Sequence, residues 1–211
     1  NHMNKNNKIK CIVLVAREHG LSTLRELQST NNYQITAIFT HKFNPKSYDA
    51  ETKIRDDFED FQLFASQNKI PLYTIDSTDQ KKLLEDFASK NEFEFLLSIS
   101  WRYLIPPQVF EKAEFGAINL HRGDLPKYAG VEPIRKALEN NEERIAVCCH
   151  HITKNYDEGE VIFKSYHDSN YDEGMSLELN IERLKKEITK YFPELTIKTF
   201  KHLTKEDTNE K

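Results

Sequence analysis

Three polar residues in the second half of the chain have the types and spacing that acid–base chemistry needs. Asn119 and His121 stand two residues apart at the end of a short apolar run, so in a strand their side chains would point to the same side. Histidine exchanges a proton near neutral pH, and an asparagine amide can donate to a developing oxyanion. Asp157, in a later loop, can orient His121 or relay a proton. Taken alone, Asn119 and His121 also fit a turn with satisfied polar side chains.

The chain before this cluster alternates strand-like and helix-like segments. Apolar, β-rich runs are followed by apolar residues at helical spacing, such as Leu21, Leu24 and Leu27, and Ser77 to Gln80 has the form of a capping box. Strands that alternate with helices predict parallel βαβ units with right-handed crossovers. The expected strands are 8–16, 33–41, 70–75, 93–100 and 115–120.

The pattern changes after the histidine. A helix is expected over 132–141, and the two strand-like runs 144–153 and 159–167 are joined by a link short enough to suggest antiparallel pairing. A last amphipathic helix is expected from Leu177 to Tyr191. The sequence therefore predicts an α/β fold with a mostly parallel twisted sheet, helices on both faces and an antiparallel C-terminal part.

One domain is expected over residues 4–192, because 211 residues are enough to bury one hydrophobic core. Residues 193–211 are interpreted as a charged C-terminal extension or tail, and residues 1–3 as a remnant of cloning. In an open α/β sheet, ligands bind beyond the carboxyl ends of the strands. The loops after 93–100, 115–120 and 145–153 are therefore expected to form the site together.

One segment of the chain resembles the signature of the folate-dependent formyltransferases, and it reads INLHRGDLPKYAGVEPIRKALENNEERIAVCCHHITKNYDEGEVI. It has, in order, an Asn-x-His strand end, a Leu-Pro turn, a Gly before a helix and an Asp-x-Gly before the next strand. The resemblance covers residues 96–162 strongly and extends weakly back to Ile9. It implies a Rossmann-like formyltransferase fold that uses 10-formyltetrahydrofolate as formyl donor, with no metal.

The resemblance also implies a catalytic set of Asn119, His121 and Asp157. An acceptor amine would attack the formyl carbon, and Asn119 with protonated His121 would stabilise the negative oxygen. Asp157 would hold the imidazole and help a proton to reach the departing folate nitrogen.

A pterin-binding loop is implied at residues 100–105, where backbone groups would meet the ring edge and apolar side chains would cover the ring. The loop from Thr153 to Asp157 would close the other side. Trp101 and Leu104 are equally compatible with simple core packing. The expected donor contacts are Ser100, Trp101, Arg102, Tyr103, Leu104, Ile105, Thr153 and Tyr156.

The acceptor side departs from the family pattern. Arg122 and Gly123 stand where the family often has Pro and Ser, and AREHGLS after the first strand lacks a Gly-rich anion-binding loop. The length left after the domain also leaves no room for the C-terminal OB-type domain of the methionyl-tRNA enzymes. The pattern therefore favours a small enzyme that formylates a nucleotide-linked amino sugar. The expected acceptor contacts are Arg122, Gly123, Lys127 and Tyr128.

Several alternatives stay open from the sequence. Arg122 and Lys127 could be solvated loop charges, and the acceptor could be glycinamide ribonucleotide or charged tRNA. A non-catalytic folate-binding relative would need none of the three polar residues. The run Cys148-Cys149-His150-His151 invites a metal site, although successive strand side chains point to opposite faces and would not converge on one ion.

Composition limits the kinds of binding partner that the protein is expected to have. The formal net charge of −4 makes nucleic acid an unlikely partner, and no run approaches the roughly 20 apolar residues that span a bilayer. Three cysteines, two of them adjacent, are a poor disulfide framework and fit a reducing compartment. We expect a cytoplasmic enzyme of one-carbon metabolism that binds small molecules, with homodimer formation left open.

Overall fold

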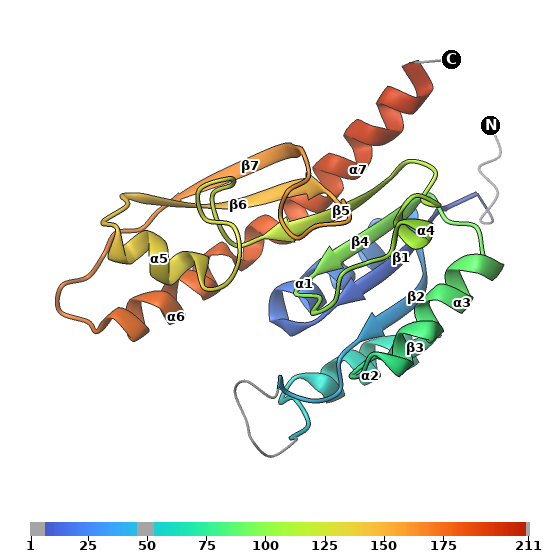
Figure 1. Ribbon diagram of the computed structural model, residues 1–211, viewed down its shortest axis with the longest axis horizontal. Coiled ribbons are helices and arrows are strands. Elements are labelled where there is room, and N and C mark those ends of the chain that lie inside the picture. The colour runs from blue at the N-terminus through green and yellow to red at the C-terminus, as the bar shows by residue number, and fades with distance from the viewer. Residues whose placement is uncertain (1–6, 46–52, 210–211) are drawn as a thin grey trace.

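The computed structural model describes residues 7–45 and 53–209, and these form one seven-stranded sheet covered by helices (Figure 1). The strand order is β3-β2-β1-β4-β5-β6-β7. The strands are β1 Ile9–Val15, β2 Tyr33–Thr40, β3 Leu72–Thr74, β4 Phe95–Ile99, β5 Gly116–His121, β6 Arg144–His151 and β7 Val161–Asp168. The helices are α1 Arg17–Ser29, α2 Phe58–Gln67, η1 Asp79–Lys81, α3 Lys82–Lys90, α4 Pro107–Phe110, α5 Pro133–Glu139, α6 Leu177–Glu187, η2 Ile188–Lys190 and α7 Tyr191–Asn209.

The first five strands pair in parallel, and β6 and β7 are added antiparallel to them. The predicted fold class, including the antiparallel C-terminal part, is confirmed. From β1 the chain builds outward to β3, and it then returns to place β4 and β5 on the other side of β1. The strand order therefore reverses between β1 and β4, which creates a crevice at the carboxyl ends of these two strands.

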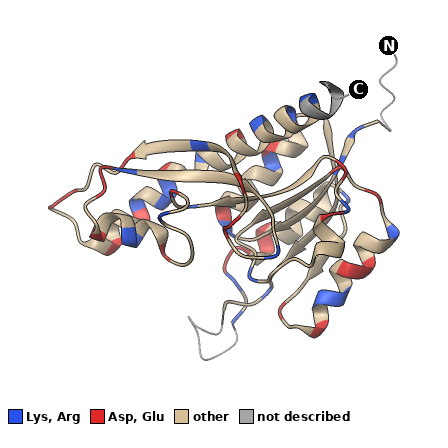
Figure 2. Cartoon of the chain, turned by 45° about the horizontal axis from the view of Figure 1, so that its top comes forward, with Lys and Arg blue, Asp and Glu red and all other residues tan. Residues whose placement is uncertain are grey.

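Both faces of the sheet are buried, so the central strands are continuously apolar. Cys11, Val13 and Val15 of β1 belong to the larger core cluster, with α1, α2 and the C-terminal helices. Ile12 and Leu14 belong to the smaller cluster on the opposite face, with α3 and α4. Acidic and basic residues interleave along the outer surfaces of the helices (Figure 2). Within the described residues, no helix is long and apolar enough to cross a membrane.

The expected tail from residue 193 is instead part of helix α7, and this prediction was wrong. Phe192, Leu195, Phe200 and Leu203 recur at helical spacing and are buried against the sheet. The Phe200 ring stacks on Phe95 of β4, with centroids 4.0 Å apart and planes 10° apart. The many lysines and acids between these positions hid the apolar stripe in the sequence. The domain therefore continues past residue 192.

Removal of the Phe200 ring is expected to destabilise the whole domain, because the ring is fully buried between α7 and β4. Phe200→Ala should lower the free energy of unfolding by about 3–5 kcal/mol, with an unchanged denaturant m-value. Urea unfolding followed by circular dichroism measures this. Leu179→Ala, at a side chain 54% exposed, is the control and should change the free energy by less than about 0.5 kcal/mol. An unfolding midpoint for Phe200→Ala equal to that of the wild type would show that α7 is not part of the core.

Candidate active site

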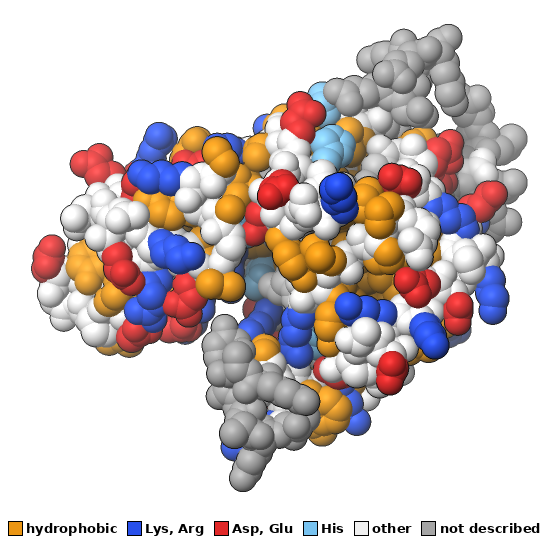
Figure 3. Space-filling model, in the orientation of Figure 1, with side chains coloured by type: hydrophobic (Ala, Val, Ile, Leu, Met, Phe, Trp, Pro, Cys, Tyr) orange, Lys and Arg blue, Asp and Glu red, His pale blue; other side chains and the backbone are white. Residues whose placement is uncertain are grey.

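A cavity of about 740 Å³ lies where the strand order reverses. Its walls come from the ends of β1, β4 and β5, from the 100–105 loop and from the 152–157 loop. In the space-filling view this face is hollowed, with hydrophobic side chains gathered beside the hollow (Figure 3). Four non-glycine residues with positive φ line it: Arg17 (71°), Ser100 (59°), Glu132 (53°) and Asp157 (54°). Backbone in this sparsely populated region often marks functional sites.

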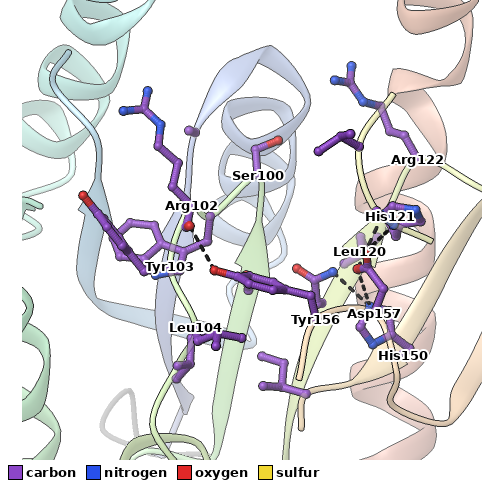
Figure 4. Close-up of a pocket in the computed structure, with 18 of the residues that line it drawn as sticks. Ser100, Arg102, Tyr103, Leu104, Leu120, His121, Arg122, His150, Tyr156 and Asp157 are labelled. Atoms are coloured by element: carbon purple, nitrogen blue, oxygen red, sulfur yellow. Dashed lines mark hydrogen bonds and ion pairs between the residues drawn. The ribbon is translucent and has the colours of Figure 1, made fainter. Parts of the chain in front are cut away.

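The structure brings Asn119, His121 and Asp157 together in this cavity. Figure 4 shows His121, Asp157 and His150 beside one another. His121 Nδ1 lies 3.5 Å from Asp157 Oδ1. The Asn119 amide donates to Nε2 of His150, 3.0 Å away, because Asn119 and His150 are directly opposite each other in the β5–β6 pair. All three expected catalytic residues therefore lie in one cluster of polar side chains in the cavity.

Asp157 reaches this group by a route that the sequence analysis did not foresee. Because β6 is antiparallel to β5, its carboxyl end lies at the opposite edge of the sheet from that of β5. The loop after β6 turns back, and Gly159 packs so closely on His151 that a Cβ would lie 1.6 Å from the His151 carbonyl oxygen. Only glycine fits this approach. The Gly130 amide donates to Asp157 Oδ2 at 3.0 Å and fixes the carboxylate.

The imidazole of His121 lies between two acceptors. Its Nε2–H donates to the Tyr128 carbonyl at 2.7 Å, and its Nδ1 faces Asp157. Gly123 allows this arrangement, because a Cβ there would lie 2.9 Å from Nε2 and 2.8 Å from the Tyr128 oxygen. Gly123 therefore packs beneath the ring and does not line the cavity.

Burial lowers the pKa of His121 below its ordinary value, although the Asp157 charge and the Tyr128 carbonyl act to raise it. The ring is therefore neutral in the resting site at neutral pH. When the ring takes up a proton, acceptors already face both nitrogens. The residue is thus arranged to accept a proton transiently as a base.

Asp157 carries the negative charge of the group. Burial alone would raise the pKa of its carboxyl, but His150, the ring of His121 and the Gly130 amide outweigh that effect and lower it. Nε2 of His150 lies 3.7 Å from Asp157 Oδ1. The carboxylate stays ionised beside a neutral base.

His150 is a further member of the site, opposite Asn119. Its Nδ1–H donates to the His151 carbonyl at 2.8 Å, which leaves Nε2 as the acceptor for Asn119. This bond fixes the Asn119 amide so that its oxygen and second N–H remain for other partners. The only signal in the sequence was the alternation along β6, which puts His150 on one face and Cys149 on the other.

All eight expected donor contacts line the cavity. Tyr156 of one wall donates from its hydroxyl to the Arg102 carbonyl of the other wall at 3.1 Å (Figure 4). His19 also lines the cavity: it bonds Ser100 through Nε2 and Oγ, 2.8 Å apart, and is buried. Burial lowers the pKa of His19 well below its usual value, and the charge of Arg122 acts in the same direction.

A buried histidine on β2's end holds the 100–105 loop, and no sequence pattern pointed to it. The His41 ring stacks on Trp101, with centroids 4.3 Å apart, and its Nε2 accepts from the Arg102 amide at 3.2 Å. Its Nδ1–H donates to the Ile75 carbonyl. Burial lowers the pKa of His41 to about 3, so the ring is neutral and can accept from Arg102. The loop is therefore preformed.

Of the four residues expected to contact the acceptor, only Arg122 lines the cavity. Arg122 lines the cavity, as does Arg17 at the start of α1. Lys127 pairs with Glu142 at 2.8 Å, and the buried Tyr128 donates from its hydroxyl to the same carboxylate. Neither side chain lines the cavity, so neither supports the stacking and phosphate contacts that were expected of them.

Cys148 and Cys149 lie on opposite faces of β6, as the strand alternation predicts. Cys148 packs with Leu125 in a small apolar cluster, and Cys149 accepts from the Thr199 hydroxyl in the main core. His150 meets Asn119. These side chains do not converge, and the described residues contain no group of three or more His, Cys, Asp or Glu arranged to hold a metal ion.

The chain belongs to the formyl transferase family, whose model matches residues 9–195. The resemblance read from the sequence is thereby confirmed. The match extends over the sheet from β1 and into α7, so it includes every residue of the group around His121.

Named relatives and solved structures agree with this family. A methionyl-tRNA formyltransferase of Orientia tsutsugamushi (strain Boryong) is 29% identical over 157 residues, which are 73% of this chain and 48% of that protein. This chain thus spans about half the length of that relative. Among solved structures, a formyltetrahydrofolate deformylase from Pseudomonas syringae pv. tomato has a TM-score of 0.72 at 18% identity, covering 95% of this chain and 63% of that one. Glycinamide ribonucleotide transformylase 1 from Symbiobacterium toebii has a TM-score of 0.67 at 17% identity, covering 92% and 88%.

The electrostatic coupling of His121 to Asp157 can be measured without any substrate. Asp157→Asn removes the charge that raises the pKa of His121, so burial should dominate further and the His121 titration should move to lower pH. Histidine NMR titration measures this, with His121→Ala identifying the signal. Glu158→Gln is the control, since it removes a neighbouring charge and should leave the midpoint in place. A midpoint that rises in Asp157→Asn would contradict the arrangement.

Proposed function

We propose that this protein is a cytoplasmic N-formyltransferase that moves the formyl group of 10-formyltetrahydrofolate to a primary amine. The observation that carries the proposal is the group formed by Asn119, the neutral His121 and the ionised Asp157 within one cavity. Membership of the formyl transferase family supports the same reaction. The name of one solved structure with the same fold, a formyltetrahydrofolate deformylase, supports a formylated folate as the donor.

The donor fits the walls of the cavity. A pterin is a flat ring with polar edges and apolar faces, which suits a slot with few directed hydrogen bonds. The 100–105 loop offers backbone groups held in place by His41 and His19, and Leu104 and Ile105 offer apolar surface. The Arg102 carbonyl, now bonded to Tyr156, is an acceptor for a ring N–H. We infer that the ring binds between this loop and the 153–157 loop.

The residues of the group then have separate tasks. As the amine nitrogen bonds to the formyl carbon, the Asn119 amide donates to the oxygen that gains charge. His121 takes the proton that the attacking amine loses, and Asp157 stabilises the resulting imidazolium. The same proton passes to the folate nitrogen as its bond to the formyl carbon breaks. Donor and acceptor thus exchange one formyl group for one proton.

For the acceptor we propose an amine on a nucleotide-linked amino sugar. Arg17 and Arg122 both line the cavity, and both charges act on the pKa of His19, which places them around the same end. Two guanidinium groups suit a diphosphate, since each can donate two parallel hydrogen bonds. Arg122 is the one residue of the expected acceptor set that supports this role.

A panel of acceptors tests this choice. With 10-formyltetrahydrofolate as donor, formyl transfer should be seen to an amino sugar nucleotide and should raise released tetrahydrofolate in proportion. Arg122→Met should raise the acceptor KM about tenfold, while Lys127→Met, which removes a charge outside the cavity, should leave it unchanged.

The outcomes separate the alternatives. If only glycinamide ribonucleotide or charged tRNA were formylated, the proposed amino sugar acceptor would be wrong. The assignment as a formyltransferase would still hold. Folate binding with no transfer to any acceptor would indicate a non-catalytic relative.

A further inference from the structure

One backbone carbonyl decides which nitrogen of His121 carries the hydrogen. The Tyr128 carbonyl oxygen lies 2.7 Å from Nε2 of His121. A carbonyl oxygen can only accept a hydrogen bond, so Nε2 is the nitrogen that donates. In the neutral ring Nδ1 is then without a hydrogen, and it faces Asp157 Oδ1 at 3.5 Å. The nitrogen that can take up a proton is therefore Nδ1.

The Tyr128 carbonyl belongs to a turn that is fixed on both sides. The Tyr128 amide donates to the Asp124 carbonyl at 2.8 Å. The phenol ring is 5% exposed and packs in the main core. Its hydroxyl donates to Glu142 Oε1 at 2.8 Å. Because the hydroxyl and the carbonyl belong to one residue, anchoring the side chain limits the directions that the carbonyl can take.

Glu142 is a firm anchor for this hydroxyl. Its amide donates to the Ala137 carbonyl of α5 at 3.0 Å, and its carbonyl accepts from the Ser169 hydroxyl at 2.8 Å. Hydrogen bonds from Lys127 and from the Tyr128 hydroxyl lower the pKa of its carboxyl, so the group is ionised at neutral pH. A hydrogen bond to an ionised acceptor is stronger than one between neutral groups.

The Tyr128 carbonyl has to compete with a charge on the other side of the ring. Burial lowers the pKa of His121, Asp157 opposes this, and His150 and Arg122 add to the lowering. For the neutral ring, the Asp157 carboxylate favours a hydrogen on Nδ1. The carbonyl favours Nε2 from the shorter distance, 2.7 Å against 3.5 Å. If the carbonyl turned away, the hydrogen would move to Nδ1 and block the proton-accepting nitrogen.

We propose that Tyr128 and Glu142 are positioning residues for His121. The bond from the Tyr128 hydroxyl to Glu142 holds the carbonyl, and the carbonyl keeps the hydrogen on Nε2 so that Nδ1 can accept a proton. The catalytic consequence rests on the proposed function. The attacking amine loses its proton to Nδ1, and Nδ1 passes the same proton to the departing folate nitrogen. The hydrogen on Nε2 stays in place throughout.

Nitrogen NMR of the imidazole rings in the labelled full chain measures the tautomer without any substrate. Above the pH at which His121 titrates, the wild-type ring should be the Nε2–H form, with His121→Ala identifying the signals. In Tyr128→Phe, which keeps the buried ring, and in Glu142→Ala, the ratio of the Nδ1–H form to the Nε2–H form should rise about three- to tenfold. Glu142→Gln keeps an oxygen that can accept from the hydroxyl and should keep the wild-type ratio.

Tyr191→Phe is the matched control. It removes a tyrosine hydroxyl that bonds Nδ1 of His167 at 2.9 Å, a hydrogen bond of similar length away from the His121 ring. This variant should leave the tautomer of His121 as it is in the wild type. A wild-type ring in the Nδ1–H form, or a ratio that changes in neither Tyr128→Phe nor Glu142→Ala, would overturn this inference.

Kinetics then separate positioning from binding. In formyl transfer, Tyr128→Phe and Glu142→Ala should lower kcat about three- to tenfold and leave the acceptor KM unchanged. A changed tautomer with an unchanged kcat would overturn the positioning role. Absence of formyl transfer in the wild type would overturn the proposed function, whereas the tautomer measured by NMR would still stand.

Discussion

The proposed catalytic group of Asn119, His121 and Asp157 depends on one close contact of the backbone, between Gly159 and the carbonyl of His151. β6 joins a parallel sheet in the antiparallel sense, so the loop that follows it starts at the wrong edge for chemistry at the end of β5. The loop must turn back, and it does so at Gly159, where a Cβ would lie 1.6 Å from the carbonyl oxygen of His151. That return places Asp157 beside His121 and at the amide of Gly130. The position of the Asp157 carboxylate is therefore a consequence of strand direction and one glycine.

The balance between burial and charge sets the protonation states of His121 and Asp157. Burial would neutralise both His121 and Asp157, but His150, His121 and the Gly130 amide keep the carboxylate ionised, whereas the imidazole loses its proton. The result is a neutral base with acceptors facing both nitrogens, beside a fixed charge. His150 completes the arrangement, because it orients the Asn119 amide from the neighbouring strand. Each protonation state follows from position more than from residue type.

The sequence supported prediction of the fold and of the side chains that meet in the cavity because both leave local signals. Alternating strands and helices define the sheet, and an Asn-x-His strand end with an Asp-x-Gly defines the group. Long-range partners leave no such signal, so His41 under the 100–105 loop and His150 opposite Asn119 were missed. Lys127 and Tyr128 are close to the site in sequence but turn toward Glu142. Helix α7 was missed because charged residues outnumber its apolar stripe.

A double-mutant cycle of His121→Ala and Asp157→Asn in single-turnover formyl transfer tests the central claim most directly. If the two residues act as one proton-handling unit, each change should slow transfer by a factor on the order of 10² or more. The double variant should then be no slower than the slower single variant. A double variant whose loss equals the product of the two single losses would show that the residues act independently and would contradict this account.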